Sequence, residues 1–323
     1  MPADRTVTTA EFPMRDLAFS LGMLVLTVGV VVLYGVRLLV RGRARHERTE
    51  KDGGSIFVGK GFMEMGYWLA GPLVAALDRA GFTANAVTLA SLVPATAAAV
   101  AVANGWFGLA CVLATGASFC DLLDGLLAKR QGSSSDAGEA LDAMIDRYVE
   151  LLFMGGLVVY YRTSVVLCVL SLLAALGAFA ISYSTAKAEA LGVPPPRGSM
   201  RRAERAIYLL FAAGLTPFAG ALVGPGRPQL LREAPMILAV ALIAVVANIS
   251  AARRLRAIMD AIRVRDTCRA QLADAAPPAG ASAGVPMPAP GAVAPNASTA
   301  VTAPRLLTGG GASLLTTVDK VRG

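Results

Sequence analysis

Four aspartates at helical spacings are the residues of this 323-residue chain whose types and positions suggest chemistry. Asp121 and Asp124 are three residues apart, and Asp142 and Asp146 are four apart. On a helix, both spacings put the members of a pair on one face. The polar connection between the pairs, "KRQGSSSDAG", is short, so we expect antiparallel helices whose four carboxylates converge at one end of a bundle.

Carboxylates that converge in this way require a cation, because four neighbouring negative charges cannot all stay ionised alone. Carboxylate oxygens without His or Cys suit Mg²⁺ or Mn²⁺, and two such ions would bind a diphosphate. The single histidine, His46, lies in a basic loop and is interpreted as solvated. The four cysteines have no metal-ligand spacing and are interpreted as buried small hydrophobic residues without disulfides. General acid–base chemistry therefore falls to carboxylates, Lys or Tyr.

The aspartates belong to a longer pattern, D-x2-D-G-x2-A-x9-G-x3-D-x3-D, in which Gly125, Ala128 and Gly138 would keep a groove open. A single aspartate at a helix end can simply complement the helix dipole. Seven fixed positions at frequencies of about 5–10% each occur by chance on the order of once in 10⁸ positions, which argues against that explanation for the set. The pattern resembles the motif of the CDP-alcohol phosphotransferase family, D-x2-D-G-x2-A-R-x8-G-x3-D-x3-D.

The resemblance covers roughly residues 60–260 and implies a six-helix membrane core, usually dimeric, with two divalent ions in a cytoplasm-facing cavity. It implies transfer of the phosphatidyl group of CDP-diacylglycerol to the hydroxyl of a small polar, phosphorylated alcohol, with release of CMP. By matching position, Asp146 would be both a metal ligand and the base toward the acceptor hydroxyl. The other metal ligands would be Asp121, Asp124 and Asp142. The nucleotide would be bound by Asn85, Thr88, Gly125, Ala128, Lys129 and Gly138.

Two positions depart from the family motif. The arginine that follows the alanine is Lys129 here, which keeps the charge but loses the two-point grip of a guanidinium on phosphate. Arg130 is adjacent, yet one residue turns about 100° around a helix, so it does not automatically take that place. Upstream, "TANAVT" resembles the family's Pro-Asn-x-x-Thr opening, with Ala84 where Pro is typical. Neither change affects a carboxylate, so an enzyme remains the prediction.

Two basic stretches bear on the acceptor. "SYSTAKAEALG" and "RRAER" resemble segments of bacterial phosphatidylinositol phosphate synthases. In them, Lys187, Arg202 and Arg205 could surround an anionic group near the metal site. Positive charge at cytoplasmic helix ends is an equally good explanation of these residues. Inositol phosphate and glycerol 3-phosphate both fit such a basic cluster.

The elements that must position these residues are membrane helices. Apolar residues make up 55% of the chain and charged residues 16%, which is typical of a multi-span membrane protein. The net charge of +8 is explained by topology, because the basic residues cluster at the ends of apolar runs, and we expect no nucleic acid partner. The predicted fold is an all-α integral membrane protein with an N-terminal anchor, an interfacial helix and six core runs. These runs are 85–105, 106–127, 141–161, 164–186, 206–224 and 234–252.

The chain is expected to divide into five parts. Residues 1–16 precede a transmembrane anchor at 17–40, and 41–82 form a basic linker with the interfacial helix. Residues 83–260 form the catalytic membrane domain. Residues 261–323 form a tail, rich in Ala and Pro, that is expected to be disordered. Basic residues group on one side of alternating runs, which places the Asp-rich stretch in the cytoplasm of a bacterium, at the inner membrane. Lipid contact and a homodimer are expected.

Three other functions account for parts of the pattern. A polyprenyl synthase would show tight DDxxD clusters in a soluble helical fold, and the sequence has neither. A membrane transporter predicts ionisable residues near the bilayer midplane, whereas these aspartates lie at helix ends. A catalytically silent homologue is suggested by Lys129. Metal-dependent formation of CMP would distinguish an enzyme from it.

Overall fold

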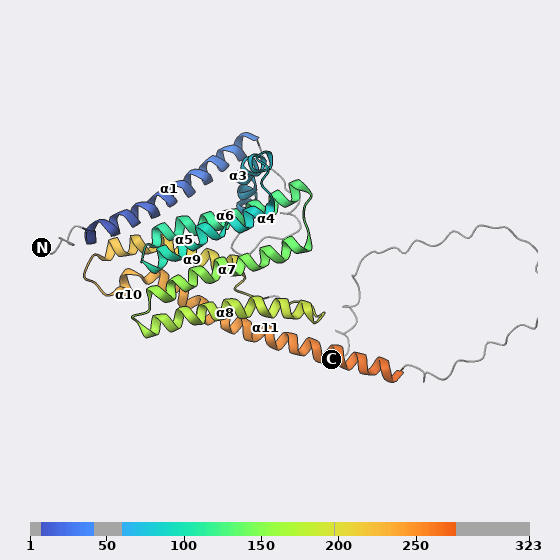
Figure 1. Cartoon of the computed structure of the whole chain (residues 1–323). Helices are drawn as coiled ribbons and strands as arrows, with labels where there is room; N and C mark the ends of the chain where they lie inside the picture. Colours follow the sequence, from blue (N-terminus) through green and yellow to red (C-terminus); the bar gives the residue numbers. More distant parts are fainter. Residues whose placement is uncertain (1–7, 42–59, 197, 276–323) are drawn as a thin grey trace, which may run out of the picture. The chain divides into compact units, whose positions relative to one another are not determined.

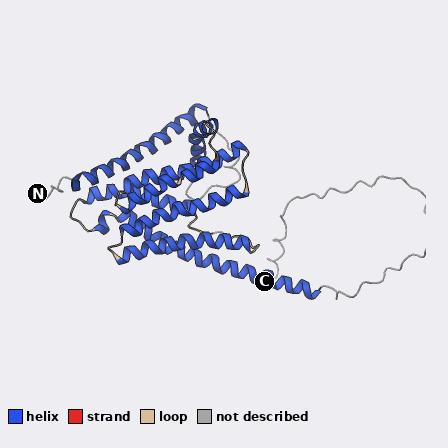
Figure 2. Cartoon of the chain, viewed as in Figure 1, coloured by secondary structure: helices blue, strands red, loops and turns tan. Residues whose placement is uncertain are grey.

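A computed structural model of the chain describes residues 8–41, 60–196 and 198–275, which form helices joined by short loops (Figures 1 and 2). The chain divides into two units, Met1–Gln271 and Leu272–Gly323, and the fold described below is that of the first. The predicted disorder after residue 275 and the solvated position of His46 lie outside the described residues. The prediction of an all-helical membrane protein is confirmed.

Two helices precede the core. Helix α1 (Thr8–Arg41) includes the predicted anchor and begins before it, and α3 (Lys60–Arg79) occupies the predicted interfacial segment. The rings of Tyr34 and Trp68 lie 5.7 Å apart and join the two helices. The guanidinium of Arg37 lies 5.6 Å from the Trp68 ring, within the range of a cation–π contact.

The core follows the six predicted runs, with one break and one addition. Its helices are α4 (Ala84–Ala90), α5 (Leu92–Ala103), α6 (Phe107–Gln131), α7 (Asp136–Tyr160), α8 (Val165–Ala190), α9 (Arg202–Val223), α10 (Gln229–Arg232) and α11 (Ala234–Ala275). The first run is broken at Ser91, because Pro94 has no N–H to donate to the carbonyl four residues earlier. The short helix α10 was not predicted.

Six stretches of the described chain are long and apolar enough to cross a membrane, and α7 is not among them. Helix α7 is 25 residues long, as α6 is, but carries six charged residues. These are Asp136, Glu139, Asp142, Asp146, Arg147 and Glu150. It packs between α5 and α8, so its charges face neighbouring helices as well as solvent. This polar helix in an apolar bundle is where chemistry is expected.

Small residues bring the core helices into close contact. Helix α5 packs against α6 and α7, and α6 packs against α9 (Figure 1). A Cβ atom added at Gly156 of α7 would lie 2.5 Å from the carbonyl oxygen of Ala99 in α5. Glycine at such a crossing lets two helix backbones approach in a membrane protein. On the other side of the bundle, Asn248 of α11 donates to the carbonyl of Leu173 in α8 at 2.8 Å.

The connection between α6 and α7 fixes the two motif halves beside each other. Gly132 ends α6 with a φ of 61°, the left-handed conformation typical of a helix C-terminus. Three residues later, the hydroxyl of Ser135 accepts a hydrogen bond from the N–H of Gly138 at 3.2 Å and caps α7. The turn is therefore tight, and α6 and α7 run antiparallel with their aspartate-bearing halves on the same side of the bundle.

Helix α11 extends further than predicted. The catalytic domain was expected to end at residue 260, but the helix continues to Ala275. No Gly or Pro occurs between Pro235 and Pro277, so nothing in the sequence stops the helix earlier. Cys268 is exposed on this extension, contrary to the expectation that all cysteines are buried, and all four cysteines are free.

Helix α1 is joined to the core by a carboxylate. The first residues of α6 have no cap from Trp106, which precedes them. Instead, Oδ1 of Asp16 in α1 accepts a hydrogen bond from the N–H of Leu109 at 3.0 Å. The carboxylate suits the positive end of the α6 dipole. The anchor is thus a structural partner of the helix that carries Asp121.

Gly108 tests this contact, because a Cβ added there would lie 2.2 Å from the carbonyl oxygen of Asp16. We expect Gly108→Ala to displace α1 and to lower the free energy of unfolding by about 1–3 kcal/mol, as overpacked sites do. Thermal unfolding of purified protein in detergent measures the effect. Gly116→Ala on the same helix meets nothing within 4 Å and is the control. Equal stability of the two variants would contradict the close packing of α1.

Candidate metal centre and substrate site

Three of the four motif aspartates come together in the halves of α6 and α7 that the turn joins, with Asp121 and Asp146 near the middle of the helices and not at the predicted helix ends. Asp121 of α6 and Asp142 and Asp146 of α7 each offer an oxygen, and these oxygens lie within 4.8 Å of one another. We call these residues the three-aspartate group. All three side chains are half-buried. A set made only of carboxylate oxygens fits a hard divalent cation such as Mg²⁺ or Mn²⁺.

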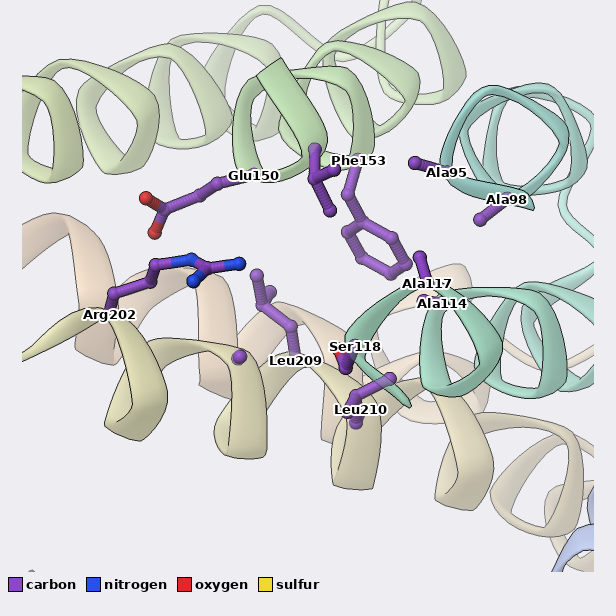
Figure 3. Close-up of a pocket in the computed structure, with 12 residues that line it drawn as sticks. Ala95, Ala98, Ala114, Ala117, Ser118, Glu150, Phe153, Arg202, Leu209 and Leu210 are labelled. Carbon is purple, nitrogen blue, oxygen red and sulfur yellow. The ribbon is translucent and has the colours of Figure 1, made fainter. Parts of the chain in front are cut away.

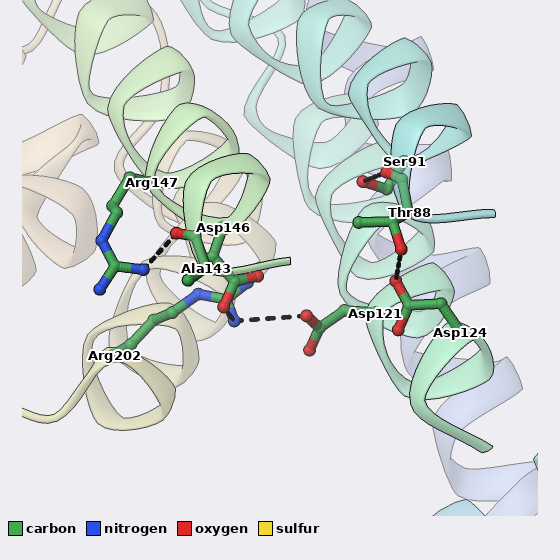
Figure 4. Close-up of polar contacts among 8 residues, drawn as sticks. All are labelled: Thr88, Ser91, Asp121, Asp124, Ala143, Asp146, Arg147 and Arg202. Carbon is green, nitrogen blue, oxygen red and sulfur yellow. Dashed lines mark hydrogen bonds and ion pairs between the residues drawn. The ribbon is translucent and has the colours of Figure 1, made fainter. Parts of the chain in front are cut away.

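The fourth aspartate, Asp124, lies outside this group. It is 5% exposed, and its Oδ2 accepts a hydrogen bond of 2.6 Å from the hydroxyl of Thr88 in α4 (Figure 4). A spacing of three residues leaves Asp121 and Asp124 about 60° apart around α6, compared with about 40° for the four-residue spacing on α7. The α6 carboxylates therefore face different neighbours, and Thr88 satisfies the buried one.

Arg202 is the cation next to the three-aspartate group. It is the first residue of α9, and its Nη1 lies 3.4 Å from Oδ1 of Asp121. The same nitrogen donates to Oδ2 of Asp146, so one guanidinium links carboxylates from two helices (Figure 4). The sequence prediction placed Arg202 near the metal site, and the structure brings it there.

The residues predicted to bind the nucleotide are distributed over α4, α6 and α7. Asn85 is exposed at the start of α4, and its Oδ1 would lie 3.6 Å from a Cβ added at Gly138 of α7. A Cβ added at Gly125 would meet nothing within 4 Å, so the backbone there is open to a ligand. Ala128 packs partly against the apolar cluster of α3, α4 and α6, and Lys129 is exposed.

Arg130 does not take the place of the family arginine. Its Nε donates to Oδ2 of Asp78 in α3 at 2.8 Å. Gln131 donates to the other oxygen of Asp78 at 3.2 Å. The hydrogen bond from Arg130, followed by that from Gln131, holds the pKa of the Asp78 carboxyl below its usual value. Arg130 is thus engaged with α3, while Lys129 is exposed and directly follows Ala128 of the motif.

The other two predicted basic residues occupy different positions from Arg202. Lys187 is exposed near the end of α8. Arg205 has no exposed surface, and its guanidinium binds Glu150 of α7. In this arrangement Arg205 is not accessible to an acceptor. The sequence analysis did not identify Glu150. The available signal was spacing: Glu150 follows Asp146 by four residues and Arg205 follows Arg202 by three, so the members of each pair lie on one helix face.

A small cavity of about 60 Å³ lies behind Arg202, between α5, α6, α7 and α9 (Figure 3). Glu150 and Arg202 supply its charged lining, and most of the rest is apolar. The apolar lining includes Ala95, Ala98, Ala117, Phe153 and Leu209. Glu150 and Arg202 therefore mark the boundary between the polar site and the apolar interior of the bundle.

Comparison with known proteins gives one family and one group of relatives. Residues 82–247 match the family model described as CDP-alcohol phosphatidyltransferase. The phosphatidylinositol phosphate synthase of Streptomyces avermitilis is 33% identical over 198 residues, covering 59% of this chain and 80% of the relative. That of Mycobacteroides abscessus is 34% identical over 187 residues, covering 56% of this chain and 81% of the relative.

Solved structures lead to the same group. The phosphatidylinositol phosphate synthase of Mycobacterium tuberculosis with CDP-DAG bound is similar with a TM-score of 0.51 and 26% identity, over 58% of this chain and 92% of that one. The same enzyme in complex with manganese and citrate has a TM-score of 0.52 and 26% identity, over 59% and 88% of the two chains. The range of the family model, 82–247, includes the four aspartates of the motif.

The Thr88–Asp124 hydrogen bond generates a stability prediction. Thr88→Val keeps the shape but leaves the buried carboxylate without this donor, so we expect the free energy of unfolding to fall by about 1.5–3 kcal/mol. Thr96→Val, at an exposed position of α5, should change it by less than about 0.5 kcal/mol. Thermal unfolding in detergent compares the two. A loss at Thr88 no larger than at Thr96 would show that the bond does not hold Asp124.

Proposed function

Because the chain belongs to the CDP-alcohol phosphatidyltransferase family, we propose that it transfers the phosphatidyl group of CDP-diacylglycerol to the hydroxyl of a small phosphorylated alcohol and releases CMP. The protein is an integral membrane transferase of phospholipid biosynthesis. The observation that carries the proposal is the three-aspartate group with a guanidinium beside it, at the position of the family motif.

The metal ligands in this proposal are Asp121, Asp142 and Asp146, with Asp124 as the fourth ligand that the family motif implies. Their oxygens suit Mg²⁺ or Mn²⁺, and a related synthase was crystallised with manganese. When bound, two divalent ions would offset charge on the diphosphate and on the departing CMP. Asn85, Thr88, Gly125, Ala128, Lys129 and Gly138 would bind or line the nucleotide.

Asp146 is proposed to accept the proton of the acceptor hydroxyl. Its side chain is 17% exposed, so it is shielded yet reachable from the site. Arg202 is proposed to bind the anionic part of the acceptor, because its guanidinium is 35% exposed and already lies at the carboxylates. Because Arg202 contacts Asp146, an acceptor bound by Arg202 would have its hydroxyl close to the carboxylate that accepts the proton. Lys187 is a proposed second contact for the acceptor.

Inositol phosphate is the acceptor that we propose, and glycerol 3-phosphate is the second candidate. The relatives named above are phosphatidylinositol phosphate synthases, and a phosphate-bearing acceptor matches the charge of Arg202. Asp121 and Asp146 lie near the middle of α6 and α7, so the depth of the three-aspartate group does not distinguish an enzyme from a transporter. The match to a transferase family favours an enzyme.

The same arrangement supports proposals about topology and assembly. Basic residues gather at the aspartate end of the bundle, which favours placing this end in the cytoplasm, at a bacterial inner membrane. Exposed apolar side chains along α1 and α8 suit contact with lipid. A homodimer is proposed from the family resemblance.

The role of Asp146 predicts the behaviour of Asp146→Asn. Loss of a general base typically costs about 10²–10⁴-fold in rate, and loss of a metal ligand adds to this. We expect no measurable CMP release from CDP-diacylglycerol by the purified variant. Wild-type thermal unfolding and yield from membranes establish that it is folded. A variant with near-wild-type turnover would refute the assigned base.

The acceptor is tested in isolated membranes with radiolabelled CDP-diacylglycerol and a panel of headgroup alcohols. We expect a labelled lipid product with inositol phosphate that requires Mg²⁺ or Mn²⁺, because the basic side chain at the site matches a phosphate. A product with glycerol 3-phosphate alone would select the second candidate. Absence of product with every alcohol, from membranes that contain the folded protein, would indicate a catalytically silent homologue.

A further inference from the structure

A pocket of about 320 Å³ lies where α1 meets α3, apart from the site described above. We call it the Arg37 pocket, and its lining consists of Leu33, Val36, Arg37, Val40 and Trp68. Its three aliphatic side chains are exposed, so the pocket opens on the apolar surface of α1 that suits contact with lipid. All five residues precede the segment 82–247 that matches the family. The pocket is therefore a feature of this chain outside the catalytic core.

Arg37 supplies the charge of the pocket. Its guanidinium carbon lies 5.6 Å from the centre of the Trp68 ring and 6.0 Å from that of Tyr34, both within the range of a cation–π contact. Such a contact gives the N–H groups no oxygen acceptor, and a guanidinium has five of these donors. Nη1 of Arg37 is buried and has no hydrogen-bond partner in the described part of the chain. The aromatic rings thus hold the cation without satisfying its donors.

The neighbouring carboxylate of Glu64 in α3 does not satisfy them either. Glu64 is 7% exposed, and its Oε2 accepts a hydrogen bond of 3.4 Å from the hydroxyl of Tyr34. Glu64 and Arg37 both belong to the described residues, and no ion pair joins them. A buried donor without an acceptor costs free energy in an apolar environment. A ligand with anionic oxygens would supply what the protein does not.

The depth of the pocket in the membrane indicates the class of ligand. The spanning stretch of α1 is Met14–Val40, so Arg37 lies about one helical turn before its end. Near the end of a spanning helix, an arginine reaches the headgroup level and tryptophan is enriched. Asp16, near the start of α1, contacts the start of α6, so the other end of α1 lies on the side of the α6–α7 turn (Figure 1). Phospholipid phosphates of that leaflet are the anionic oxygens at this depth.

We propose that the Arg37 pocket binds the headgroup of an anionic phospholipid. The guanidinium of Arg37 donates to the phosphate oxygens, and the exposed side chains of Leu33 and Val36 contact the acyl chains. A headgroup with net negative charge is favoured over a zwitterionic one, because the ammonium group of the latter would bring a second positive charge close to Arg37. The site does not depend on the proposed function, since it shares no residue with the three-aspartate group.

The two tryptophans of the chain allow a direct measurement, because Trp106→Phe leaves Trp68 as the only fluorescent indole. The full-length Trp106→Phe protein is reconstituted in phosphatidylcholine vesicles. Equal mole fractions of brominated phosphatidylglycerol or brominated phosphatidylcholine, with bromine near the headgroup, are then added to quench Trp68. We expect phosphatidylglycerol to associate with the pocket about fivefold more strongly, the preference that one basic residue at a membrane surface provides.

Two substitutions in the Trp106→Phe protein show whether the preference comes from Arg37. Arg37→Gln removes the charge and should abolish the preference. Arg79→Gln, at an exposed position of the same helix as Trp68, removes one basic charge eleven residues away and should leave the preference unchanged. Each variant is normalised to its own fluorescence in vesicles without bromine, and thermal unfolding in detergent verifies that it is folded.

A second reporter shows whether the effect is local. In the Trp68→Phe protein the remaining indole is Trp106, which precedes α6 at the opposite side of the membrane. Quenching of Trp106 should be the same with and without Arg37→Gln. A change at Trp106 as large as that at Trp68 would indicate a general rearrangement and would overturn the assignment of the site.

Three further results would overturn the proposal. The first is equal quenching of Trp68 by the two brominated lipids. The second is a preference that persists in folded Arg37→Gln. The third is an equal loss in Arg79→Gln, since the net charge of the surface would then explain the preference. If Arg37→Gln does not fold, Arg37→Lys decides in its place and should lower the preference to about half or less, because an ammonium lacks the two-point grip of the guanidinium.

Discussion

Negative charge within an apolar helix bundle has to be neutralised, and this requirement governs the region where α6, α7 and the start of α9 meet. Three carboxylates lie with oxygens within 4.8 Å of one another, and the Arg202 guanidinium contacts two of them. One positive charge does not balance three negative ones at this range. The same excess of negative charge that destabilises an empty site provides affinity for divalent cations, and through them for a diphosphate.

The rest of the fold can be understood as support for this arrangement. The short turn from Gly132 to Ser135 brings the two halves of the motif together. Asp16 of α1 caps the far end of α6, so the anchor stabilises the helix that presents Asp121. At the aspartate end, α3 is tied to α6 through Asp78 and Arg130. Each of these contacts lies outside the motif, yet each fixes a helix that carries part of it.

The sequence was sufficient to predict the core helices and the antiparallel α6–α7 pair, because these follow from local spacing and from turn residues. It placed the aspartates at helix ends, whereas the helices extend further and leave Asp121 and Asp146 near their middles. It could not show that Asp124 faces Thr88, since this depends on how α6 is rotated against α4. It suggested an acceptor-binding role for Arg205, whose burial depends on Glu150 and on the backbone of Met200. Side-chain pairing between distant helices is decided by packing, which no local pattern encodes.

The most direct test of the central claim is a titration of the purified protein with Mn²⁺, followed by electron paramagnetic resonance of the free ion. We predict saturable binding that Mg²⁺ competes away and that Asp121→Asn, Asp142→Asn or Asp146→Asn each weaken at least about tenfold, because each removes a charged ligand. Asp136→Asn, an exposed carboxylate in the first turn of α7, should bind as the wild type does. Equal Mn²⁺ affinity in the wild type and all three variants would contradict the account.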